Sequence, residues 1–219
     1  MISPSDEETP FSIHCLGDSI TQAAGNPECG RWTAVLQQHF DAEKPGMVAV
    51  YNHGMGGNTS AMGLDRMRDR NIGPGLTLIQ FGLNDAACNG HSLKNRVSYA
   101  EFCENLTVIA RIVSQRNGKP VFMTNHLPDY AREPAQPDGL LYSDKIRQYN
   151  QGIREVAGRF GAVLIDMESA LPTRGMDLTR DGLHLNVAGN IRYAEIVFGA
   201  VKDSLGMRSE ACGEAALCV

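Results

Sequence analysis

The chain alternates short apolar runs with longer segments in which apolar residues recur every three to four positions. Helical periodicity is strongest from Tyr99 to Val113, from Ile146 to Phe160 and from Val187 to Leu205. Weaker helices are expected over 31–43 and from Thr59 or Ser60 onward. Five apolar runs have the length and composition of buried strands: 12–16, 47–51, 76–81, 120–124 and 162–166. The alternation predicts an α/β protein, with a five-stranded parallel sheet between two layers of helices.

The ends of the three strongest helices carry signals of their own. Ser98 and Glu101 have the spacing of a capping box, and Gly118 follows the last turn of the same segment. Gly161 and Gly206 follow the other two helices. Because the sequence contains no internal repeat and no linker, it predicts one domain over 11–206, an N-terminal extension over 1–10 and a C-terminal tail over 207–219.

Length and charge narrow the class of protein. A chain of 219 residues buries roughly 70% of the surface that it exposes when unfolded, so it needs no disulfide or metal to stabilise a core. The net charge of −5 and the absence of a basic cluster argue against nucleic acid as a partner. No apolar run approaches the ~18 residues of a membrane-spanning helix, so we expect no membrane insertion. The acidic N-terminus lacks a signal-peptide pattern and indicates a cytoplasmic protein, with a secreted mature form as the alternative.

The six cysteines form neither a CxxC pair nor a Cys/His spacing suited to zinc. We therefore expect free thiols and no metal site. Cys15 and Cys103 fall in apolar-patterned segments and are expected to be small core residues. Cys212 and Cys218 lie in the tail, where nothing in the sequence decides whether they pair.

Polar, glycine-rich segments come after the predicted strands. In a parallel sheet the ligand crevice lies at the carboxyl ends of the strands, so these segments are expected to meet. Each is typical of a turn when taken alone. Together they supply what acyl transfer needs: a serine, a histidine base, a carboxylate that orients it and N–H donors for an oxyanion. The segments are 17–21, 52–59, 82–85, 125–128 and 181–184.

Four of these segments resemble the blocks of the SGNH, or GDSL-type, serine hydrolases. The blocks follow the order of that family between Leu16 and about Asn190: Gly17-Asp18-Ser19-Ile20, Asn52-x-Gly54-x-x-Gly57-x-Thr59, Gly82-x-Asn84-Asp85 and Asp181-x-x-His184. The resemblance implies the SGNH hydrolase fold with its flavodoxin-like sheet, and it implies no cofactor. It also implies that Ser19 is the nucleophile, that Asp181 and His184 complete the triad, and that Ser19, Gly57 and Asn84 form the oxyanion hole. Gly57 is preferred to Gly56 because the glycine of the family precedes an Asp/Asn-Thr pair, here Asn58-Thr59.

The function implied by the resemblance is a serine esterase. The small share of aromatic residues, 6%, and the lack of room for a large lid favour short acyl groups, such as acetyl, on carbohydrate-like or other polar alcohols. Lysophospholipases and thioesterases of the same family, which act on longer acyl chains, are the alternative. The expected partner is thus a small-molecule or carbohydrate ester, and the oligomeric state is left open.

Residues inside or beside the blocks are secondary candidates. Asp18, Asn58, Asp85 and His126 are expected to line the substrate cleft or to support the residues that do. Asp177 is a competing carboxylate near the predicted triad, although its spacing from His184 departs from the Asp-x-x-His pattern.

Other classes of protein fit the sequence less well. Ser19 lacks the Gly-x-Ser-x-Gly elbow of α/β-hydrolases, and the loop 54–60 lacks the lysine of a P-loop and the third glycine of a dinucleotide motif. The histidines lack metal-ligand spacing. A non-catalytic carbohydrate-binding domain of the same fold is disfavoured because serine, histidine and aspartate are all present.

Overall fold

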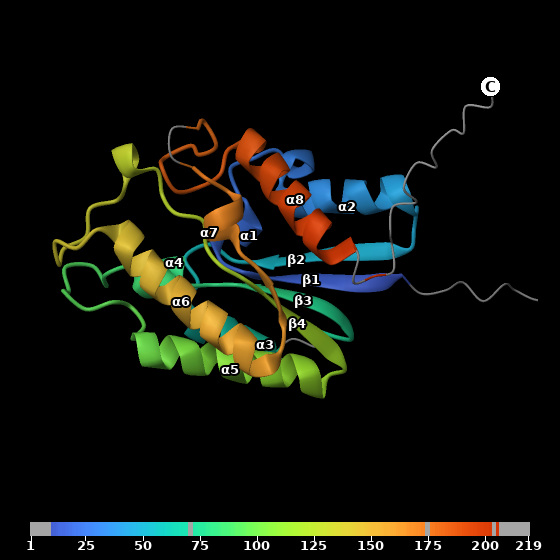
Figure 1. Ribbon diagram of the computed structural model, residues 1–219, viewed down its shortest axis with the longest axis horizontal. Helices are drawn as coiled ribbons and strands as arrows, with labels where there is room; N and C mark the ends of the chain where they lie inside the picture. Colours follow the sequence, from blue (N-terminus) through green and yellow to red (C-terminus); the bar gives the residue numbers. More distant parts are fainter. Residues whose placement is uncertain (1–9, 70–71, 174–175, 203–204, 206–219) are drawn as a thin grey trace, which may run out of the picture.

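The computed structural model describes residues 10–69, 72–173, 176–202 and 205. Its central feature is a parallel five-stranded sheet with the strand order β2-β1-β3-β4-β5 (Figure 1). This is the flavodoxin-like order, so the predicted fold class is confirmed. The strands are β1 (Phe11–Gly17), β2 (Val48–Gly54), β3 (Gly75–Gln80), β4 (Gly118–Met123) and β5 (Val163–Ile165).

Helices cover both faces of the sheet. Figure 1 shows α2 and α8 against one face and α3, α5 and α6 against the other. The longer helices are α2 (Trp32–Glu43), α3 (Ser60–Asp69), α5 (Tyr99–Gln115), α6 (Tyr142–Phe160) and α8 (Val187–Lys202). Short helical turns are α1 (Ser19–Gln22), η1 (Glu28–Gly30), α4 (Leu83–Ala86), η2 (Tyr130–Arg132) and α7 (Met167–Ala170).

The core explains why these segments fold as they do. Residues of β1 and β3 are buried on both faces of the sheet, as expected for central strands of a parallel sheet. Large side chains from the helices fill the space between the layers, among them the fully buried Trp32, Phe40, Phe102 and Tyr149. Burial on this scale supplies most of the free energy of folding.

Two of the element boundaries that differ from the sequence-based expectation have a clear structural reason. β2 continues to Gly54 because its last residues pair with the end of β1, so the segment that follows the second predicted strand begins inside the sheet. Asn117, with a φ of 59°, takes the left-handed conformation after α5, and Gly118 is already the first residue of β4. Asparagine tolerates this conformation better than most residues.

The other helix ends follow their sequence signals where the structure describes them. The N–H of Glu101 donates to Ser98 Oγ at 3.3 Å, and Gly161 ends α6 with a φ of 57°. Cys15 is buried and unpaired, whereas Cys103 is only partly buried. Gly206, Cys212 and Cys218 lie outside the described residues. Within the described ranges, no helix is long and apolar enough to cross a membrane.

Candidate active site

Ser19 begins a one-turn helix at the carboxyl end of β1. Asp18 caps this turn by accepting the N–H of Ile20 at 2.9 Å. The end of β1, just before this turn, is tightly packed. A Cβ on Gly17 would come within 2.7 Å of the Gln80 backbone carbonyl oxygen, so glycine is needed there. The side chain of Ser19 is partly exposed and faces the carboxyl edge of the sheet.

His184 reaches Ser19 from the other end of the chain. Its Nε2 lies 3.0 Å from Ser19 Oγ, and its Nδ1 lies 2.7 Å from Asp181 Oδ2. Asp181 Oδ1 accepts the backbone N–H groups of Leu183 and His184 at 3.0 and 2.7 Å. These contacts place serine, histidine and aspartate in a continuous chain of hydrogen bonds.

The Asp181 carboxylate is held in its charged form. Partial burial raises its pKa, but the hydrogen bonds from the His184 backbone and ring and from the Leu183 N–H outweigh that effect and lower the pKa to about 2. A carboxylate that is charged at neutral pH beside Nδ1 keeps the ring proton on that nitrogen and leaves Nε2 free to accept a proton from the serine.

Gly57 lies in the loop after β2, and Asn84 lies in the one-turn helix α4 after β3. Gly57 has a φ of 76° and open space around its Cα, and its N–H finds no acceptor among the described residues. The N–H of Gly56, by contrast, donates to Gln22 Oε1 at 2.9 Å. The Asn84 side chain uses one N–H to bind the Asn58 carbonyl oxygen at 3.0 Å, which leaves its second N–H available.

The secondary candidates are buried and support the loops rather than line an open cleft. Asp85 accepts the N–H of Ser60 at 2.9 Å and also its hydroxyl, at the start of α3. Burial raises the pKa of Asp85 to about 6 and that of Asp18 to about 7, despite the hydrogen bonds that both carboxylates accept. The carbonyl of the buried Asn58 accepts from Asn84.

His126 lies behind the histidine of the site. It is 1% exposed, and its Nε2 donates to the Leu183 carbonyl oxygen at 2.8 Å. Burial and, to a smaller extent, the neighbouring His184 outweigh the hydrogen bond to Leu183 and lower the pKa of His126 to about 4, so the ring is neutral near pH 7. His126 therefore fixes the loop that carries His184. Asp177 is exposed, and its backbone carbonyl oxygen accepts from Asn186 Nδ2 at 2.9 Å.

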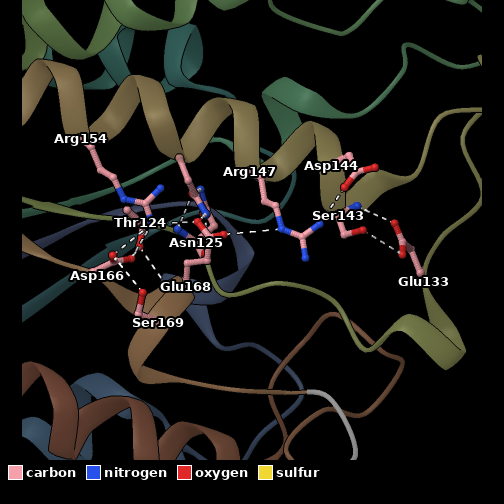
Figure 2. Close-up of polar contacts among 11 residues, drawn as sticks. Thr124, Asn125, Glu133, Ser143, Asp144, Arg147, Arg154, Asp166, Glu168 and Ser169 are labelled. Carbon is pink, nitrogen blue, oxygen red and sulfur yellow. Dashed lines mark hydrogen bonds and ion pairs between the residues drawn. The ribbon is translucent and has the colours of Figure 1, made fainter.

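A network of polar side chains stabilises the loops after β4 and β5 (Figure 2). Arg154 of α6 binds Asp166 at 2.9 Å and Glu168 at 2.9 Å, and Glu168 accepts from Asn150. Asn150 in turn donates to the backbone carbonyl of Asn125, immediately before His126. The network anchors α6 to this edge of the sheet.

The network continues inward to the nucleophile turn. Gln80, at the end of β3, donates to Asn125 Oδ1 at 2.7 Å and to Asp18 Oδ2 at 3.3 Å. The side-chain oxygen Oε1 of Gln80 accepts the hydroxyl of Thr21 at 3.0 Å. Three neighbouring strand ends are thus joined by buried amide and carboxylate groups, which makes the edge that carries Ser19 rigid.

Sequence reasoning missed three residues that hold the site together. Arg66 donates to the carbonyl oxygens of His53 and Gly17, Gln80 joins the strand ends, and Arg96 contacts both Asn84 and the Gly57 carbonyl. None of the three stands in a recognisable motif, so a single sequence gives no signal for them. Among the described residues, no three His, Cys, Asp or Glu side chains gather as metal ligands would.

Comparison with known proteins establishes the class. Residues 15–191 match the GDSL-like lipase/acylhydrolase family, and solved structures of an acetyl xylan esterase and of the esterase EstA share the fold. The protein is therefore a carboxylic ester hydrolase. The chain belongs to the GDSL-like lipase/acylhydrolase family, which confirms the resemblance found in the sequence. No curated protein matches the chain.

Solved structures extend the likeness to nearly the whole described fold. A lipase/acylhydrolase from Enterococcus faecalis is 25% identical, with a TM-score of 0.69 over 89% of this chain and 96% of that one. TesA is 24% identical, with a TM-score of 0.71 over 88% of this chain and 98% of that one. The acetyl xylan esterase AlAXEase is 24% identical, with a TM-score of 0.73 over 87% of this chain and 100% of that one.

Proposed function

We propose that the protein is a serine esterase that forms an acyl-enzyme on Ser19. The observation that carries the proposal is the chain of contacts from Ser19 Oγ to His184 Nε2 at 3.0 Å and from His184 Nδ1 to Asp181 at 2.7 Å. A serine hydroxyl is a poor nucleophile unless a base removes its proton, and this arrangement supplies a base in the required tautomer.

The reaction follows from these positions. Ser19 Oγ attacks the ester carbonyl while His184 Nε2 takes the hydroxyl proton, and charge develops on the carbonyl oxygen. The N–H groups of Ser19 and Gly57 and the free N–H of Asn84 bind that oxygen. His184 then gives its proton to the departing alcohol, and a water molecule repeats the sequence to release the acid and restore Ser19.

The proposed substrates are esters of short acyl groups, such as acetyl, with carbohydrate-like or other polar alcohols. The side chains of His184 and Asp181 are 33% and 53% exposed, so the site is open and suits a small acyl group on a larger polar molecule. A neighbour in structure is described as an acetyl xylan esterase, and at 24% identity it supports the fold of this proposal rather than its substrate.

A fluorophosphonate probe and a set of esters test the proposal. We expect the probe to label the wild-type protein and the control variant Ser114→Ala, whose serine lies on α5, but not Ser19→Ala. p-Nitrophenyl acetate should be hydrolysed faster than the butyrate and octanoate, and acetylated xylan should release acetate. Full activity of Ser19→Ala on p-nitrophenyl acetate would overturn the mechanism. A preference for octanoate would overturn the proposed substrate class alone.

A further inference from the structure

Arg96 joins the two loops that carry the proposed oxyanion donors. Its Nη1 donates to Asn84 Oδ1 at 3.2 Å, and its Nη2 donates to the Gly57 carbonyl oxygen at 3.0 Å. Asn84 follows β3 and Gly57 follows β2, and these strands are separated in the sheet by β1. One guanidinium therefore bridges two segments that belong to non-adjacent strands.

The backbone around Arg96 is itself well anchored. The Arg96 N–H donates to the Ala87 carbonyl oxygen at 2.8 Å, and the preceding residue forms an antiparallel bridge, Cys88↔Asn95. Asn95 Nδ2 binds the hydroxyl of the buried Tyr149 at 3.0 Å. Arg96 thus extends from a fixed point on the segment that leads from α4 to α5.

These contacts determine how the Asn84 amide is oriented. Arg96 occupies its oxygen and the Asn58 carbonyl occupies one of its N–H groups, so the remaining N–H has a single direction. A donor to the amide oxygen also polarises the amide and strengthens its N–H as a donor. At Gly57 the guanidinium binds the backbone carbonyl oxygen, and the N–H of the same residue has no acceptor among the described residues.

We propose that Arg96 is a positioning residue that clamps the oxyanion hole by fixing Asn84 and Gly57 relative to each other. This inference rests on the proposed function, because it assigns Arg96 a role in the same reaction. The planar guanidinium presents several N–H donors in a fixed fork, so it reaches two acceptors at once. A lysine ammonium at the end of a flexible chain does not reproduce that geometry.

Steady-state kinetics on p-nitrophenyl acetate test the clamp. Removing one oxyanion donor outright costs about 10²–10³ in turnover, so loosening the donors through Arg96→Ala should lower kcat by roughly 10- to 100-fold. KM should stay within about twofold, because the lost interaction acts on the transition state. Arg96→Lys should recover only part of the loss. Arg68→Ala, which removes an exposed arginine of α3, is the matched control and should keep wild-type kcat.

Two results of these measurements would overturn the clamp. A kcat for Arg96→Ala within twofold of the wild type would show that the donors hold their positions unaided. A raised KM with unchanged kcat would show that the guanidinium binds an anionic part of the substrate instead. Thermal unfolding of each variant distinguishes the expected fall in kcat from a loss of folded protein.

A double-mutant cycle with Asn84→Ala tests whether Arg96 acts through Asn84. In the Asn84→Ala background, Arg96→Ala should lower kcat at least fivefold less than it does in the wild type, since one of the clamped donors is already missing. Effects that multiply independently would contradict the inference. Labelling of Ser19 by the fluorophosphonate probe distinguishes the two proposals: if Ser19 is labelled and the cycle shows no coupling, only the clamp fails.

Discussion

Replacing Asp181 by asparagine should lower kcat strongly while leaving the local fold in place. The asparagine oxygen can accept the N–H groups of Leu183 and His184 that Asp181 Oδ1 now accepts at 3.0 and 2.7 Å. Its amide nitrogen then faces His184 Nδ1, which must become the acceptor. The ring proton moves to Nε2, the nitrogen that lies 3.0 Å from Ser19 Oγ, and His184 can no longer take the serine proton.

The size of the effect follows from the exposure of the carboxylate. A tautomer change of this kind costs about 10⁴ in kcat where the aspartate is fully buried. Asp181 is 53% exposed, so water partly replaces the carboxylate, and we expect a loss of about 10³. The lowering of the Asp181 pKa to about 2 corresponds to roughly 2 kcal/mol of folding stability before solvent screening. Screening by water reduces this contribution to about 1 kcal/mol, and its loss in Asp181→Asn should lower Tm by about 2–4 °C.

The assay compares kcat on p-nitrophenyl acetate and Tm for Asp181→Asn, Asp181→Ala and the control Asp177→Asn. Asp181→Ala also loses the two backbone hydrogen bonds, so its Tm should fall further than that of Asp181→Asn. Asp177→Asn alters an exposed carboxylate nearby and should leave both quantities unchanged. A kcat for Asp181→Asn within tenfold of the wild type would refute the tautomer argument.

Two further predictions concern residues around the site. Gly54→Ala places a Cβ 2.1 Å from the Gln22 backbone nitrogen, and no side-chain rotation relieves this clash. The substitution should destabilise the fold by about 1–3 kcal/mol in urea unfolding. It should also lower kcat, because it moves the turn that carries Ser19. Gly73→Ala, with open space around it, is the control, and equal stability of the two variants would contradict this. Because burial raises the pKa of Asp85 to about 6, the folded state binds more protons than the unfolded state between about pH 4 and 6, and stability should fall as pH rises through that range. Asp85→Asn should remove up to about 3 kcal/mol of this fall in unfolding free energy, measured by urea unfolding, and an unchanged fall would show that Asp85 does not titrate there.

The sequence was sufficient to predict the sheet and the residues that meet at its edge. An apolar run reflects burial on both faces of a strand, and helical periodicity reflects burial on one face of a helix. The fold shows the first in β1 and the second in α5. The parallel topology then brings the segments that carry Ser19 and His184 together at the carboxyl edge. The prediction of the fold succeeded because it depended on the order of elements and not on their exact ends.

Contacts that depend on tertiary detail could not be predicted. Arg96 contacts residues 12 and 39 positions away, and Gln80 contacts residues 45 and 62 positions away. Nothing in their local sequence distinguishes them from other polar residues. The end of β2 was misplaced for a similar reason: Asn52 and His53 read as loop residues, but the edge of β1 provides backbone partners that local propensity cannot anticipate.

The double use of the Asp181 carboxylate has a consequence for how the site assembles. One oxygen binds the backbone of the same short loop, and the other binds the His184 ring, so the relation between acid and base is settled within four residues. The rest of the fold has to bring the Asp181–His184 pair to Ser19, which lies 165 positions before His184 in the sequence. Alignment of the triad thus reduces to one distance between Ser19 and this pair, and a change elsewhere in the fold disturbs the triad only as far as it alters that distance.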